Sequence, residues 1–150
     1  MLIDFLLAAL HHLLFFGLIA MLAAESSVLR GPLDANALQR LGRIDAAYGL
    51  VAGLLLIAGG LRIAYGLKGW DFYAHNPWFH AKLGAFLLAA LISVVPTLRI
   101  LRWRRAYRLD PSALPGPADA AGLRPWIGAQ FALLAVILLC AAGMARHGGL

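Results

Sequence analysis

The sequence predicts an all-α integral membrane protein, a bundle of four helices that each cross the lipid bilayer. Hydrophobic residues make up 62% of its 150 residues and charged residues only 13%, with a mean hydropathy of +0.79. A soluble domain carries about 25% charged residues, so this chain lacks the charge needed to coat a surface that faces water. The apolar residues also gather in four long runs that are separated by short polar segments.

The four apolar runs have the length that a spanning helix requires, which is about 20 residues. Within one domain, residues 1–150, the runs cover residues 3–24, 44–66, 78–98 and 126–145. Strands of an outer-membrane barrel are shorter, about 10 residues, and alternate in polarity, which none of the runs does. The first run lacks the basic start of a signal peptide and contains Asp4, so we expect a retained helix.

The segments between the runs differ in composition. Residues 68–77 are rich in aromatic side chains, which favour the headgroup region of a bilayer. Residues 99–108 contain five arginines, and residues 111–122 are rich in proline, glycine and alanine. We therefore expect the third helix to continue past the bilayer for a basic turn or two, followed by flexible chain.

The basic residues indicate how the bundle is oriented. The positive-inside rule places loops rich in lysine and arginine in the cytoplasm. The first and third loops hold most of them, namely Arg30, Arg40, Arg43, Arg99, Arg102, Arg104, Arg105, Arg108 and Arg124. The opposite side holds Lys68 and Arg146, with Arg62 and Lys82 near helix ends. Both termini are therefore expected on the outer, periplasmic side of a bacterial inner membrane, and the net charge of +6 needs no nucleic-acid partner.

Ionisable side chains inside the apolar runs are informative because each costs about 2.5–3.5 kcal/mol at the bilayer centre. On the first helix, Asp4, His11, Leu18 and Glu25 recur every seven residues and share one stripe, whereas His12 lies about 100° away. We therefore expect His11 to face the bundle interior. Two interpretations stay open there, a histidine hydrogen-bonded across helices and a ligand or proton-transfer group.

Three further basic residues reach the same depth of the membrane as His11. Arg62 lies near the outer end of the second run, and His80 and Lys82 lie at the outer start of the third. If Arg62 and Lys82 point inward they favour an anionic ligand; otherwise they snorkel to the headgroups. His80 is two residues from Lys82 and is expected to point to the opposite side of its helix.

At the cytoplasmic ends of the first two runs lie two carboxylates, Glu25 and Asp45. The sequence places them beside Arg30, Arg40 and Arg43. We expect ion pairs at the membrane surface there, which add little stability because such pairs remain in contact with water.

Small residues and a proline are expected to shape the second and third helices. Gly49 and Gly53 have GxxxG spacing, which serves close helix packing inside the bundle or in a homo-oligomer. Pro96 is expected to kink the third helix, with Ser93 and Thr97 satisfying the freed backbone groups.

Histidines on different helices with cations nearby are typical of a haem b site. Haem takes imidazoles as axial ligands, and its propionates need cations. His11 (or His12) and His80 would ligate the metal, while Arg62 and Lys82 would pair with the propionates. The sequence lacks C-x-x-C-H, which excludes covalent c-type haem, and its single cysteine, Cys140, excludes an internal disulfide.

The stretch Trp78-Phe79-His80-Ala81-Lys82-Leu83 stands at the head of a helix. It resembles the corresponding stretch of HemJ-type protoporphyrinogen IX oxidases, small multi-helix inner-membrane proteins that bind haem. The functional residues of that family are a histidine of the first helix and the lysine of this stretch. The resemblance implies an oxidoreductase in which His11 or His12, together with Lys82, takes part in catalysis.

A second set of residues spans nearly the whole chain. It comprises His11-His12, Asp45, Tyr48-Gly49, Gly59, Arg62, Lys68-Gly69, Tyr73, Asn76, Lys82, Ser93 and Pro96-Thr97. With these residues the chain resembles a bacterial family of uncharacterised four-helix membrane proteins. This resemblance implies a topology and candidate site residues, but no activity.

Three functions follow as hypotheses. The first is a haem- or porphyrin-binding redox protein with His11 as ligand. The second is a protein that binds or transports a small anion or a proton-coupled solute as an oligomer, with Arg62 and Lys82 holding the solute and His11 carrying protons. The third is an accessory membrane subunit without chemistry of its own.

Overall fold

The computed structural model describes residues 2–66 and 69–146, and all regular structure in that part of the chain is helical, which confirms the all-α class. The helices are α1 (Leu2–Val28), α2 (Ala35–Tyr65), α3 (Gly69–Ala74), α4 (Pro77–Leu109), α5 (Pro117–Ala121) and α6 (Arg124–Arg146). Helices α1, α2, α4 and α6, the last joined with α5, are long and apolar enough to cross a membrane. Lys68, which the sequence places on the outer side, lies outside the described residues.

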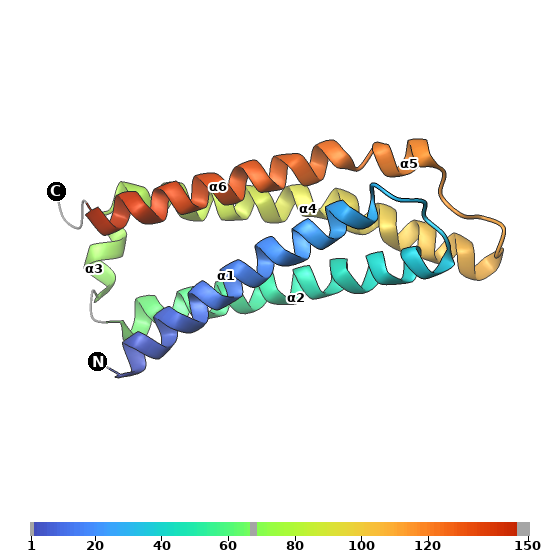
Figure 1. Cartoon of the computed structure of the whole chain (residues 1–150). Coiled ribbons are helices and arrows are strands. Elements are labelled where there is room, and N and C mark those ends of the chain that lie inside the picture. The colour runs from blue at the N-terminus through green and yellow to red at the C-terminus, as the bar shows by residue number, and fades with distance from the viewer. Residues whose placement is uncertain (1, 67–68, 147–150) are drawn as a thin grey trace.

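The four long helices form two pairs. Helix α1 packs along α2, and α4 packs along α6, while the pairs meet mainly through α2 and α4 (Figure 1). The start of α1, the end of α6 and α3 lie at one end of the bundle, here called the terminal end. The α1–α2 connection and α5 lie at the other, here called the loop end. Towards the terminal end, α1 and α6 move apart (Figure 1).

Capping residues set the starts of α2 and α4, and α2 thereby begins well before its apolar run. Asp34 caps α2, and its carboxylate accepts a hydrogen bond of 2.7 Å from the Ala37 amide. Asn76 caps α4, and its side-chain oxygen accepts a hydrogen bond of 3.0 Å from the Trp78 amide. A proline follows Asn76 at the first helical position. Arg40 and Arg43 therefore belong to α2 and not to a loop. Hydropathy marks the part of a helix that lies in lipid, while caps mark its ends.

The segment after the third run matches its prediction only in part. Helix α4 continues through the arginines to Leu109, as expected. The segment that was expected to be flexible contains the short helix α5. The Asp119 carboxylate accepts a hydrogen bond of 2.9 Å from the Gly116 amide at the start of this helix. Ala120 and Leu123 are buried against the bundle, so hydrophobic contact orders this segment despite its prolines and glycines.

Apolar side chains cover much of the outside of the long helices. Leu13, Phe16, Leu91 and Leu139 are all exposed by more than 60% although they lie near the middle of their helices. Monomeric soluble proteins rarely expose such continuous apolar surface. In a bilayer these side chains contact acyl chains, and the backbone groups beneath them are satisfied within each helix.

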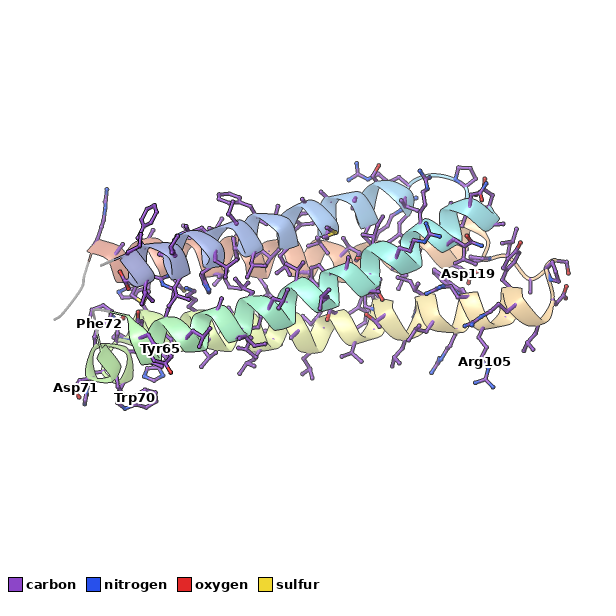
Figure 2. The ribbon with its side chains drawn as sticks, turned by 90° about the horizontal axis from the view of Figure 1, so that it is seen from below. Tyr65, Trp70, Asp71, Phe72, Arg105 and Asp119 are labelled. Atoms are coloured by element: carbon purple, nitrogen blue, oxygen red, sulfur yellow. The ribbon has the colours of Figure 1, made fainter. Side chains whose placement is uncertain are left out.

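The two ends of the bundle differ in chemistry. At the terminal end, α3 presents Trp70, Asp71 and Phe72 next to Tyr65, whereas Arg105 lies towards the loop end (Figure 2). Trp70 is 71% exposed. Aromatic rings of this kind favour the membrane interface, so the composition of both ends fits helices that run from one interface to the other.

Candidate functional site

A partly enclosed cavity of about 300 Å³ lies between the two helix pairs, on the side of the terminal end. Leucine, isoleucine, phenylalanine, methionine and glycine residues form most of its wall. The polar side chains of the lining are His11 from α1, Arg62 from α2, Tyr73 from α3 and Lys82 from α4. An apolar cavity of this size with a few converging polar groups is typical of a small-molecule site.

His11 reaches the cavity because α2 carries a glycine opposite it. A Cβ atom on Gly59 would lie 3.4 Å from His11 Cε1, so the missing side chain leaves room for the imidazole beside α2. The Nδ1 atom of His11 is buried and has no hydrogen-bond partner in the described part of the chain. The Leu55 backbone carbonyl lies close enough to act on the imidazole. A buried polar atom is normally satisfied, so a ligand could supply the partner that Nδ1 lacks among the described residues.

His12 takes a different position, although it is the next residue. Its side chain is exposed, and its Nδ1 atom lies 2.6 Å from the Ala8 carbonyl oxygen of the preceding turn. It does not line the cavity. The structure therefore directs His11 inward and His12 outward, as the helical phase predicts.

Arg62 and Lys82 bring positive charge to the same cavity from two helices. Both side chains lie close enough to His11 to act on it electrostatically, and Arg62 acts on Lys82 as well. The Nε atom of Arg62 is buried without a hydrogen-bond partner among the described residues. Positive charges that converge in a low-dielectric site repel one another. An anion bound between them would offset this repulsion and would therefore be stabilised.

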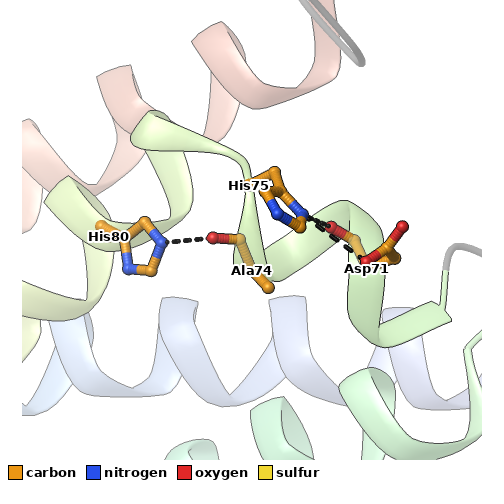
Figure 3. Close-up of polar contacts among 4 residues, drawn as sticks. All are labelled: Asp71, Ala74, His75 and His80. Carbon is orange, nitrogen blue, oxygen red and sulfur yellow. Dashed lines mark hydrogen bonds and ion pairs between the residues drawn. The ribbon is translucent and has the colours of Figure 1, made fainter.

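His80 is not brought to this site. Its side chain is exposed, and its Nε2 atom lies 2.9 Å from the Ala74 carbonyl oxygen (Figure 3). Its neighbour His75 is also exposed and lies 3.6 Å from the Asp71 carboxylate. Among the described residues no three histidine, cysteine or acidic side chains gather to hold a metal ion. Of the two histidines predicted to ligate a haem iron, only His11 faces the cavity.

Helix α3 covers the cavity at the terminal end. Tyr73 is buried and contributes to the lining. Its ring packs against Phe79 of α4, with 5.2 Å between ring centroids, and against Phe72 at 5.3 Å. These edge-to-face contacts fix the position of Tyr73. The sequence predicted an aromatic interfacial segment here, but a helix that contributes to the site could not be read from it.

A second buried polar cluster lies nearer the loop end. The prediction that its carboxylates form ion pairs at the membrane surface was wrong. Glu25 and Asp45 were expected to form ion pairs at the surface, but they are only 2% and 8% exposed and lie inside the bundle. Thr97 was expected to satisfy the backbone near Pro96, but its hydroxyl instead donates a 2.7 Å hydrogen bond to Asp45 Oδ1. The signal was present in the sequence, because Glu25 shares the seven-residue stripe of His11.

A second cavity of about 270 Å³ is lined by Tyr48, on which both carboxylates act. Leu56 and Phe86 line both cavities, so the two adjoin. Gly49 and Gly53 also line the second cavity, and a Cβ atom on either would meet nothing within 4 Å. Within this chain the two glycines of the GxxxG motif therefore leave space in the second cavity and do not bring two helices into close contact.

Comparison with known proteins yields one finding. A family model described as "Predicted membrane protein (DUF2214)" matches residues 3–149. Neither a curated protein nor a solved structure matches the chain.

Proposed function

Because the chain belongs to the DUF2214 family of predicted membrane proteins, we propose that it is a membrane protein that binds haem b or another porphyrin and has a redox role. One observation carries the proposal. The cavity between the helix pairs combines apolar walls with two cationic side chains and a buried imidazole nitrogen that lacks a hydrogen-bond partner among the described residues. A porphyrin has the matching chemistry, namely an apolar ring, anionic propionates and a metal that takes imidazole.

Each residue of the cavity has a role in this proposal. His11 would supply an axial ligand, and Arg62 and Lys82 would pair with the propionates. Gly60 lines the cavity without adding a side chain to it, and Gly59 leaves room for the His11 imidazole. A bound haem would supply one-electron redox chemistry, and we assign any direct part in that chemistry to His11 and Lys82. His80, exposed on the outside, has no role.

The test is a visible spectrum of the purified protein. We expect a Soret band in protein from haem-replete cells, or after haem is added to the apoprotein, with a stoichiometry near one haem per chain. A colourless preparation that develops no Soret band on haem addition would overturn the proposal. Free haem in the same detergent serves as the control for non-specific partition.

A second candidate function rests on the adjoining cavities. They share Leu56 and Phe86 in their linings, and Tyr48 of the second cavity lies beside the acidic cluster. This arrangement favours binding or transport of a small anion or a proton-coupled solute, in an oligomer because four helices enclose little space. Uptake of anions by reconstituted liposomes, together with a negative haem test, would support this function over the first.

We also propose that the terminal end faces the periplasm and the loop end the cytoplasm of a bacterial inner membrane. The support is the excess of arginine at the loop end. Buried Cys140 is first replaced by alanine, and a single cysteine is then introduced as Asp71→Cys or Ser112→Cys, both at exposed positions. An impermeant maleimide should label Asp71→Cys in right-side-out vesicles and Ser112→Cys in inverted ones. The reverse pattern would contradict this orientation.

A further inference from the structure

The buried carboxylates Glu25 and Asp45 lie on neighbouring helices and share one environment. Their charges are close enough to interact, and both act on the hydroxyl of Tyr48. An ionised carboxylate in an apolar interior costs several kcal/mol unless it is paired and hydrogen-bonded. Two carboxylates side by side cannot both remain ionised there without compensation.

The surroundings compensate the two carboxylates unequally. Asp45 accepts the hydrogen bond from Thr97. The positive charge of Arg104 on α4 also attracts the Asp45 carboxylate. The side chain of Arg104 lies against Gly42, one turn before Asp45 on α2, where a Cβ atom would be 2.5 Å from Arg104 Cδ. That glycine lets the arginine reach inward. Asp45 thus has both a hydrogen-bond donor and a cation.

Glu25 has neither in the described structure. Its Oε1 atom is buried without a hydrogen-bond partner. The buried polar side chain of α6 is Gln130, which is neutral, only 1% exposed, and also has an unpartnered oxygen, Oε1. The charged and titratable groups around the pair are thus Glu25 itself on α1, Asp45 and Tyr48 on α2, and Arg104 on α4. Among the described residues, Arg104 is the cation that acts on the pair, through Asp45. Arg124 of α6 lies one turn past Glu25, where it donates a hydrogen bond to the Leu29 carbonyl oxygen.

We propose that Glu25 is a proton-binding site, occupied by a proton at neutral pH while Asp45 stays ionised beside Arg104. Protonation removes the uncompensated charge, and it converts an acceptor-only group into one that can donate to a neighbouring oxygen. Tyr48 also lines the second cavity. The proton therefore sits beside the cavity that adjoins the ligand cavity. This inference involves none of the residues assigned to the porphyrin and does not depend on that function.

A feature of the sequence makes the test direct: Glu25 is the only glutamate in the chain. Cell-free synthesis with side-chain ¹³C-labelled glutamate therefore reports this carboxyl alone, by its carbon chemical shift or its infrared carbonyl band in lipid bilayers. We expect the signature of a protonated carboxylic acid at pH 7. The signature of a carboxylate at pH 7 would overturn the proposal. So would an acid signal that is lost on adding NaCl or KCl, since it would indicate a metal-cation site.

A pair of variants provides a second readout. Glutamine has nearly the shape and hydrogen-bonding capacity of a protonated glutamic acid, so Glu25→Gln should keep the wild-type apparent Tm at pH 7. Asp45→Asn, which removes the charge that faces Arg104, should lower it. If Glu25→Gln lowers the Tm as much as Asp45→Asn does, Glu25 is ionised in the native protein and the proposal fails.

Discussion

Replacing His11 by alanine should abolish the Soret band that added haem gives the wild-type protein, while replacing His12 should leave it unchanged. The two residues are adjacent in α1 and chemically identical, but only His11 lines the cavity. Losing a partner in the outer shell of a metal site typically costs about 10–100-fold in affinity, and losing the ligand itself should cost more. The measurement is a haem titration followed by absorbance, with circular dichroism to confirm that each variant remains helical.

A second variant separates loss of the ligand from loss of the cavity. Gly59→Leu fills the space beside His11 but leaves the imidazole in the chain. It should weaken binding through steric exclusion, whereas Gly128→Leu, at an open position on α6, should not. If the His11→Ala and His12→Ala proteins bind haem equally well, His11 is not the axial ligand and this cavity is not the haem site.

The second large effect concerns stability, where α4 and α6 meet. A Cβ atom on Gly143 of α6 would lie 2.7–2.9 Å from three atoms of the Trp78 indole on α4. The indole is rigid, so it cannot give way by rotating a terminal bond. Overpacking of this kind typically costs about 1–3 kcal/mol, and in a chain of this size each kcal/mol shifts Tm by about 2–4 °C. Gly143→Ala should therefore lower the apparent Tm in detergent by several degrees.

The matched control is Gly128→Ala in the same helix, where the new Cβ atom meets nothing within 4 Å. Alanine is favoured over glycine in a helix by roughly 0.5–1 kcal/mol, so this variant should keep or slightly raise the Tm. Combining Gly143→Ala with Trp78→Leu should recover part of the loss. Equal melting temperatures of the two alanine variants would show that the indole does not pack on Gly143 in the folded protein.

Much of the candidate site could be inferred from helical phase and depth. The seven-residue stripe directed His11 inward, and the depth of Arg62 and Lys82 placed them at the same level; the structure brings all three to one cavity. Their functional roles remain predictions. The same stripe contained Glu25, but the neighbouring arginines in the sequence suggested a surface ion pair. The prediction failed because nearness along the chain says nothing about which side of a helix bundle each side chain occupies.

The sequence by itself determined that this protein is a bundle of membrane-spanning helices. In lipid every backbone polar group must be satisfied by the protein, and an apolar run of about 20 residues without alternating polarity achieves this as a helix. Only the tertiary structure decided which polar groups meet. Helical periodicity gives a direction about one helix axis, but not the helix that lies in that direction. The packing of α1 on α2 and of α4 on α6 separated His11 from His80, placed Glu25 beside Asp45, and left the two cavities between the pairs.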